Sequence, residues 1–183
     1  GDANAMTYIG ANDYCADKLL ANSSWLNAIC NSTYFESVLN VKVPTMTSNT
    51  TPSGEASSSS SLGSGYLPYK AFDNTYGTYW TTPDRSDLTP WIQYEFTEKV
   101  KVNMVSFQPE DTNRRFNAYE VLGSNDGSNF TPVLTVTDYS FSTEIEKKPM
   151  INNTSYMYWR FHITNNPTVY GMSIREIQFY GRA

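Results

Sequence analysis

The chain has few side chains of the kinds that build catalytic or metal centres, with one histidine and two cysteines among 183 residues. Zinc sites use mainly cysteine and histidine, so this count nearly excludes a zinc centre. A Ser–His–Asp triad would have to run through His162. There is no glycine-rich phosphate loop or nucleophile elbow, and Glu144 and Glu146, which share a strand face, are typical of a solvent-facing pair. We therefore expect no catalysis.

The two cysteines leave two interpretations open. Cys15 lies four residues before Leu19 and Cys30 four residues after Leu26, so both thiols fall on apolar stripes of helical spacing. A disulfide closing this loop of about 15 residues would stabilise the fold by roughly 3 kcal/mol in the chain-entropy model. The alternative is a pair of buried thiols that pack as small hydrophobic groups.

Composition and charge favour a β-rich protein that works outside a cell. Aromatic residues make up 15% of the chain, led by 14 tyrosines, whereas charged residues make up only 17%. Together with abundant Ser, Thr and Asn, this suits strands and turns better than surface helices. A net charge of −5 argues against nucleic acid as a partner, because phosphate binding needs a basic face. No apolar run approaches the ~20 residues of a transmembrane segment.

The first 45 residues differ from the rest. Between residues 11 and 40, apolar residues recur at helical spacing, interrupted by polar triplets at Asn22 and Asn31 that can cap helices. This predicts two or three helices, each shorter than the ~12–15 residues at which an isolated helix is marginal. They must pack on the β domain, a sister subunit or the rest of a longer polypeptide. We divide the chain into a helical N-terminal segment, 1–45, for linking, oligomerisation or docking, and a binding domain, 46–183.

Residues 44–65 span the boundary between the two parts, and by composition they resemble a flexible linker. Seven segments with strand chemistry follow, bounded by Pro, Gly, Asn or Asp: Trp91–Phe96, Lys101–Gln108, Asn117–Gly123, Phe130–Asp138, Thr143–Lys147, Tyr156–Thr164 and Ser173–Tyr180. In Tyr156–Thr164, Trp159 and Phe161 alternate with Arg160 and His162, so His162 is expected opposite the core. No helical pattern interrupts the strands, which predicts an antiparallel β-sandwich.

Four motifs in a fixed order carry a family resemblance. They are Ala71-Phe72-Asp73-Asn74-Thr75-Tyr76-Gly77-Thr78-Tyr79-Trp80, Pro90-Trp91-Ile92-Gln93-Tyr94-Glu95-Phe96, Gly123-Ser124-Asn125-Asp126-Gly127-Ser128-Asn129-Phe130 and Arg175-Glu176-Ile177-Gln178-Phe179-Tyr180-Gly181. From about Thr47 to Gly181 the chain resembles a discoidin or coagulation-factor C-type (F5/8 type C) domain, which includes family-32 carbohydrate-binding modules. The resemblance implies a galactose-binding-like jelly-roll sandwich, with part of the serine run at Ala56-Ser57-Ser58 in an early strand. The N-terminal segment is similar to helices that precede such modules in bacteriophage tail and gut-bacterial surface proteins.

The resemblance also implies a structural calcium ion, because family members commonly hold one in this first motif. The resemblance assigns oxygen ligands to Asp73, Thr78 and Glu176, and backbone carbonyls near Lys70 and Thr75 would complete the coordination shell. Hard oxygen donors of this kind suit calcium. Where the family often has glycine after the aspartate, this chain has Asn74, which tolerates the same left-handed backbone. Alternatively, Asp73 only caps the turn.

The family binds ligands on loops at one end of the sandwich, here 65–69, 81–89, 109–115 and 165–171. Sugar recognition needs an aromatic face and planar polar groups for hydroxyl pairs. The residues that suit these roles are Tyr66, Tyr69, Asp84, Arg85, Asn113, Arg114, Arg115 and Tyr170. Sugar-binding relatives often have histidine after the motif tryptophan, whereas this chain has Thr81 and Thr82. The arginines also have an alternative interpretation as a solvated loop pair.

The expected function is therefore non-catalytic recognition of cell-surface or matrix glycans, as part of a larger surface, secreted or phage tail protein. This places the protein outside cells, on a cell surface or on a virion, and its N-terminal helices could form an oligomer. A structural, protein-binding or lipid-binding adhesion domain without a sugar site is the alternative. Leu67, Leu88 and Met172 are modest candidates for lipid contact, although an acidic chain suits anionic membranes poorly. Trp80, Trp91, Trp159, Phe96 and Phe179 are assigned to the core.

Overall fold

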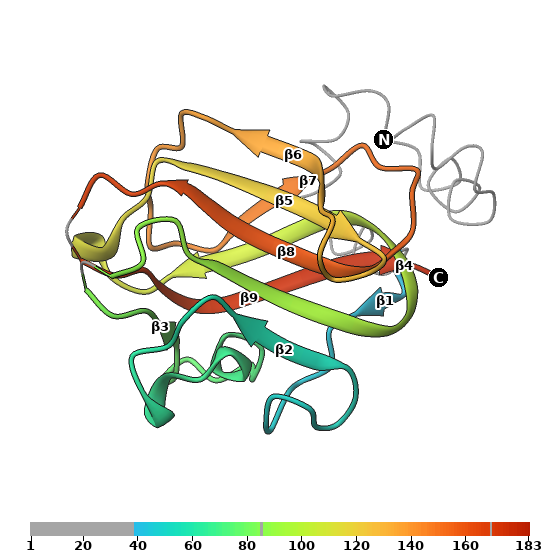
Figure 1. Ribbon diagram of the computed structural model, residues 1–183, viewed down its shortest axis with the longest axis horizontal. Coiled ribbons are helices and arrows are strands. Elements are labelled where there is room, and N and C mark those ends of the chain that lie inside the picture. The colour runs from blue at the N-terminus through green and yellow to red at the C-terminus, as the bar shows by residue number, and fades with distance from the viewer. Residues whose placement is uncertain (1–38, 85, 169) are drawn as a thin grey trace, which may run out of the picture.

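The computed structural model of the protein describes residues 39–84, 86–168 and 170–183 (Figure 1). The helices expected between residues 11 and 40, the pairing of Cys15 with Cys30 and any oligomer formed through this segment lie outside the described residues.

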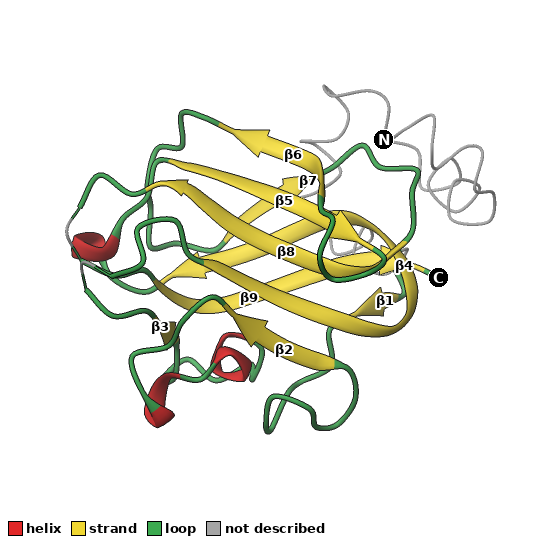
Figure 2. Ribbon diagram, in the orientation of Figure 1, coloured by secondary structure: helices red, strands yellow, loops and turns green. Residues whose placement is uncertain are grey.

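The regular secondary structure of the described part consists mainly of strands (Figure 2). The strands are β1 (Val41–Lys42), β2 (Glu55–Ser58), β3 (Trp80–Thr81), β4 (Trp91–Pro109), β5 (Ala118–Ser124), β6 (Thr131–Val136), β7 (Glu146–Pro149), β8 (Tyr156–Asn165) and β9 (Ser173–Arg182). Three short 3-10 helices are added: η1 (Ser64–Tyr66), η2 (Pro68–Ala71) and η3 (Thr112–Arg114). All strand pairs are antiparallel, as expected from the absence of helical patterns between them.

Strand β4 connects the two layers of the sandwich. Its first half pairs with β2 and β8, and its second half pairs with β7 and β9. The register shifts between Glu95 and Val100, where Thr97, Glu98 and Lys99 are exposed. A bulge of this kind bends a strand, so one strand of 19 residues takes part in both sheets. The sequence instead predicts two separate strands here, because the polar bend breaks the alternation.

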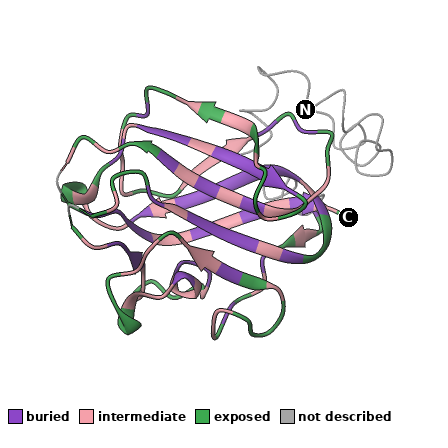
Figure 3. Ribbon diagram, viewed as in Figure 1, coloured by how far each residue is buried: buried purple, intermediate pink, exposed green. Residues whose placement is uncertain are grey.

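The core lies between the two sheets, and its positions follow the alternation expected from the sequence (Figure 3). Trp159, Phe161 and Ile163 of β8 are at most 1% exposed, while His162 lies on the opposite face. An aromatic cluster surrounds Phe107, with Phe161 at 4.9 Å and Tyr119 at 5.2 Å between ring centroids. Such rings supply much of the buried apolar area of a small β-domain.

The assignment of Trp91 to the core is wrong. Its ring lies on the outer face of β4, only half-buried, and the Arg160 guanidinium carbon stands 3.9 Å from its centroid. Phe130 covers the other side of the same guanidinium at 3.7 Å. Burial between the two rings lowers the pKa of Arg160 to about 10. The other four assigned aromatics, Trp80, Phe96, Trp159 and Phe179, are buried.

Residues 44–65 are not a free linker. Met46 and Ala56 are each 1% exposed, and β2 pairs with the first half of β4. The hydroxyls of Ser59 and Ser60 both donate to Asp87, at 2.5 and 2.8 Å. Composition alone misassigns this segment because serine-rich sequence lacks apolar alternation, whereas the family resemblance already implies an early strand at Ala56.

Candidate ligand and cation sites in the loops

Three loops meet at the end of the sandwich that lies at the left in Figure 1: residues 81–89, 109–115 and 165–171. Hydrogen bonds between them fix their relative positions. Arg114 Nη1 lies 2.9 Å from Asp84 Oδ1 in an ion pair, and the same carboxylate oxygen accepts a hydrogen bond from the Gly171 amide at 2.9 Å. Residues from each of the three loops therefore converge on one carboxylate.

Glycine is required at position 171 by this close approach. A Cβ atom there would collide with the backbone carbonyl oxygen of Thr82. Thr82 Oγ1 also accepts a hydrogen bond from the next amide, Met172, at 2.8 Å. The third loop is thus held directly against the first, which gives Asp84 a fixed position.

A pair of tyrosine rings lies near enough to Arg114 for its charge to act on Tyr79. The centroids of Tyr66 and Tyr79 are 5.2 Å apart, with the rings tilted by 40°. A hydrogen bond with Tyr66, burial and the nearby carboxylate of Glu110 raise the pKa of Tyr79, while the positive charge of Arg114 lowers it. These charges act on Tyr79 because Glu110 and Arg114 lie near it. We call Tyr66, Tyr79, Asp84, Glu110 and Arg114 the loop cluster.

Sequence reasoning selected three members of the loop cluster, Tyr66, Asp84 and Arg114, and missed two. Tyr79 lies inside a motif that was assigned to the cation site, and Glu110 follows directly after the end of β4. The signal that could have identified Glu110 is its position at the start of a ligand loop. A partner for it, Arg175, stands in the last motif, 65 positions later along the chain, and no local pattern connects the two.

The remaining predicted ligand residues lie elsewhere or outside the described residues. Tyr69 packs against the core beneath Lys70, whose ammonium lies 4.9 Å from the ring centroid. Asn113 donates to Asp111 Oδ1 of its own loop, and Arg115 is exposed at the end of η3. Tyr170 is 47% exposed and adjoins Gly171. Arg85 lies outside the described residues.

The predicted cation ligands converge more completely. Thr78 Oγ1 lies 2.8 Å from each carboxylate oxygen of Asp73 and 2.9 Å from the carbonyl oxygen of Thr75. The Thr75 amide donates both to Asp73 Oδ1 at 3.0 Å and to Glu176 Oε1 at 2.8 Å. Asn74 has a φ of 52°, the left-handed conformation anticipated from the sequence. We call Asp73, Thr75, Thr78 and Glu176 the cation loop.

Without a bound cation, the surroundings of Glu176 in the cation loop disfavour its ionised form. Burial is the main cause that raises its pKa to about 7, and the negative charge of Asp73 adds to the rise. Two carboxylates, a hydroxyl and a carbonyl around one space form a donor set that suits calcium. A bound cation would favour the ionised form of Glu176, so the residues present fit the ion that the resemblance implies.

The fit depends on oxygen atoms other than carboxylates. In the described residues no group of three or more His, Cys, Asp or Glu side chains is placed to hold a metal ion. Lys70, a fifth predicted ligand through its carbonyl, lies in η2 and has no hydrogen bond to the four residues of the cation loop. Backbone oxygens would therefore have to supply much of the coordination shell.

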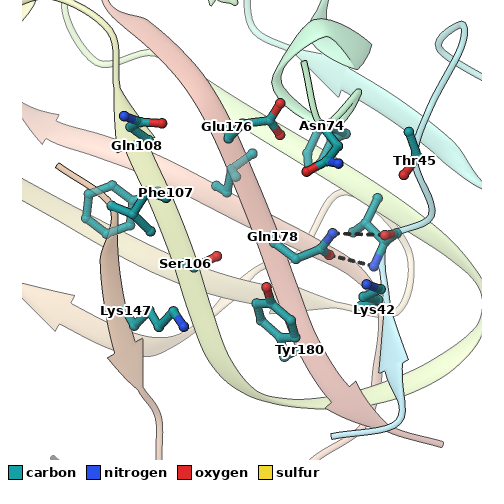
Figure 4. A pocket seen from close by; sticks show the side chains of 14 residues that line it. Lys42, Thr45, Asn74, Ser106, Phe107, Gln108, Lys147, Glu176, Gln178 and Tyr180 are labelled. Carbon is teal, nitrogen blue, oxygen red and sulfur yellow. Dashed lines mark hydrogen bonds between the residues drawn. The ribbon is translucent and has the colours of Figure 1, made fainter. Parts of the chain in front are cut away.

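A groove of about 350 Å³ lies on the outer face of β9, β4 and β7, beside the cation loop (Figure 4). Glu176 and Asn74 border one end of it, while Lys42 and Tyr180 line the other. Both amide atoms of the Gln178 side chain are used to hold the backbone of Val43, at 2.6 and 2.9 Å. The groove thus lies on a strand face, and no residue of the loop cluster lines it.

Comparison with known proteins identifies related domains. A family model described as the F5/8 type C domain matches residues 55–177. Chitosan-binding module 1 of a chitosanase/glucanase from Paenibacillus sp. IK-5 is 29% identical, with a TM-score of 0.61 over 70% of this chain and 95% of that module. The family 32 carbohydrate-binding module of NanJ from C. perfringens, solved with galactose, is 17% identical, with a TM-score of 0.61 over 76% of this chain and 99% of that module. No curated protein sequence matches.

A serum fucolectin from striped bass has the same fold, with 17% identity and a TM-score of 0.59 over 71% of this chain and 47% of that one. These likenesses confirm the galactose-binding-like sandwich that the four motifs imply. None of the helices in the described part of the chain is long and apolar enough to span a membrane.

Proposed function

The chain belongs to the F5/8 type C domain family, and from that membership we propose that it is a non-catalytic module that binds glycans through the loop cluster. The observation that carries the proposal is that a tyrosine pair and the Arg114–Asp84 ion pair lie in the same group of loops, with the charge of Arg114 acting on Tyr79. Aromatic rings can pack on the C–H face of a sugar ring, and planar charged groups can bind neighbouring hydroxyls. Both kinds of group meet here on loops held by hydrogen bonds.

The ligands named for related structures support a glycan and differ among themselves. The Paenibacillus relative at 29% identity is a chitosan-binding module, and the C. perfringens module was solved with galactose. Their ligands do not fix the sugar for this chain. We therefore propose the class, a carbohydrate, and leave its identity to a screen that includes amino sugars and galactosides.

Binding without catalysis agrees with the state of the carboxylates in the loop cluster. Asp84 is paired with Arg114 at 2.9 Å, and Glu110 lies 3.5 Å from Arg175 Nη2. Each carboxylate is thus paired with an arginine side chain and, among the described residues, is not placed beside a histidine or a second carboxylate with which it could share a proton. The two groups are suited to accept hydrogen bonds from hydroxyl or amino groups.

We further propose that calcium binds the cation loop and stabilises the fold. Asp73 and Glu176 would supply carboxylate oxygens, Thr78 its hydroxyl and Thr75 its carbonyl. At a hundredfold excess over its dissociation constant, an ion that binds only the folded state stabilises it by about 2.7 kcal/mol. When bound, the ion supplies positive charge between two carboxylates that otherwise repel.

The proposed partners are glycans of a cell surface or matrix, and the proposed place of action is extracellular, on a cell surface or on a virion. The module would act as the targeting part of a larger protein. Single glycan sites bind weakly, so several copies would be needed for firm attachment, and linkage of copies raises the effective concentration. The N-terminal segment is a candidate for that assembly.

The test is a glycan array with the chain displayed multivalently, followed by calorimetry on Arg114→Ala and Asp84→Asn. Both variants should bind the selected glycan at least tenfold more weakly and melt within a few degrees of the wild type. Lys99→Ala, in the exposed bend of β4, is the matched control and should bind normally. Arg115→Ala shows whether the second arginine contributes. A blank array with folded protein, or unchanged binding by both loop variants, would contradict the proposal.

A further inference from the structure

Tyr76 is an exposed aromatic residue whose ring and backbone both contact one arginine side chain. Its side chain is 73% exposed, the highest value among the large hydrophobic residues that the structure describes. The guanidinium carbon of Arg175 lies 4.3 Å from the ring centroid, and Arg175 Nη1 donates a hydrogen bond to the backbone carbonyl of Tyr76. One arginine thus holds both the ring and its backbone.

Packing does not explain why a tyrosine stands here. A ring that remains 73% exposed removes little apolar area from water, so its burial contributes little to folding. An exposed cation–π contact is also a weak source of stability. What the contact does is orient the ring, with one face against Arg175 and most of its surface toward solvent.

Arg175 connects this ring to the loop cluster. Its side chain is only 14% exposed, and Nη2 lies 3.5 Å from Glu110 Oε1. The Glu110 amide donates to the Ser173 carbonyl oxygen at 3.2 Å, and the Ser173 hydroxyl donates to Thr81 Oγ1 at 2.7 Å. Arg114 Nη1 lies 3.4 Å from the same Thr81 Oγ1. The Arg175–Glu110 pair therefore connects Tyr76 to the strands and loops that hold Arg114.

We propose that Tyr76 forms a second sugar subsite, so that the ligand is an oligosaccharide lying across both aromatic surfaces rather than a single terminal sugar. The inference rests on the proposed function, because it extends the same site. A first sugar packs at Tyr66 and Tyr79, where Arg114 and Asp84 bind its hydroxyls. The next sugar along the chain crosses Glu110 and Arg175 and packs on Tyr76.

The test compares short and long probes by calorimetry on the full chain. The probe pairs are glucosamine with its β-1,4-linked trimer, and galactose with GalNAc-β-1,3-galactose. Wild-type protein should bind the longer member of one pair at least threefold more tightly than the shorter. Tyr76→Ala should lose that advantage and bind the shorter member as the wild type does. Tyr76→Phe should keep it, because the ring and not the hydroxyl provides the contact.

The controls separate this inference from the proposed function and from damage to the neighbouring cation loop. Ile145→Ala removes another exposed apolar side chain, beside the groove, and should change neither affinity. A collapse of the loops in Tyr76→Ala would weaken the short probe as well as the long one, and that result would overturn the subsite. Equal wild-type affinity for short and long probes would overturn it while leaving the proposed function intact. Absence of binding to every saccharide would overturn both.

Discussion

Replacing Glu176 with glutamine should have opposite effects on stability in chelator and in calcium. In chelator the folded protein holds this carboxyl with a pKa of about 7, against 4.5 for the unperturbed group. The folded state therefore binds more protons than the unfolded state between about pH 4.5 and 7, so wild-type stability falls as pH rises through that window. Glutamine does not titrate, so the stability of the variant should not decrease with pH for this reason.

The magnitude follows from the pKa difference. A shift from 4.5 to about 7 corresponds to at most about 3 kcal/mol at 1.36 kcal/mol per pKa unit. Partial exposure screens the carboxylate and reduces the expected effect to about 1–2 kcal/mol. At pH 8 in chelator, Glu176→Gln should therefore melt about 2–8 °C higher than the wild type, using about 2–4 °C per kcal/mol for a chain of this size.

In saturating calcium the order should reverse, because the variant lacks one of the two carboxylates of the cation loop. The wild type should gain several degrees on addition of calcium and the variant much less. The assay is thermal unfolding from pH 4.5 to 8 in both conditions, with exposed Glu98→Gln as control. Superimposable pH profiles of wild type and variant in chelator would refute the electrostatic reasoning. A calcium shift of equal size in both would refute the cation site.

Two further predictions concern the loops. Gly171→Ala should weaken glycan binding at least tenfold, with a smaller loss of thermal stability. The added Cβ collides with Thr82 and must displace the loop whose amide holds Asp84. Calorimetry measures the loss of binding, and thermal unfolding measures the loss of stability. Hydrogen bonds from Asn129, together with those from Ser128 and Ser124, hold the pKa of Asp126 well below its usual range. This turn therefore adds stability above about pH 4 that is lost as pH falls, and Asp126→Ala should flatten the acid side of a stability–pH profile measured by urea unfolding. A variant profile with the wild-type acid slope would contradict this.

How far the sequence predicts the fold depends on whether a local pattern carries the information. The alternation in β8 identifies Trp159 and Phe161 as core residues, and both are buried. Trp91 follows the same chemistry but lies on the outer face, because Arg160 and Phe130 provide a partner for its ring that no spacing rule reveals. The bend in β4 was missed for a similar reason, since polar residues in a bulge look like a turn between two strands.

The cation loop and the loop cluster also differ in how far the sequence predicts them. Asp73, Thr75 and Thr78 lie within six residues of one another, so one turn brings most of the cation loop together and a local motif predicts it. The loop cluster is assembled from separate segments of the chain, around Tyr66, around Tyr79 and Asp84, and around Glu110 and Arg114. Its two missed members acquire their roles only through contacts with other elements. Glu110 is held by Arg175 across the ends of β4 and β9, and Tyr79 is defined by its contact with Tyr66.

The two sites are also joined through backbone that they share. Thr78 of the cation loop is followed by Tyr79 of the loop cluster, and Glu176 is preceded by Arg175, which holds both Glu110 and Tyr76. An ion that fixes Thr78 and Glu176 therefore also restricts the backbone that positions the aromatic surfaces. Since binding is tighter when the binding-competent arrangement is already populated, calcium should strengthen glycan binding without contacting the sugar. If the two sites were independent, calcium would raise the melting temperature and leave the affinity unchanged.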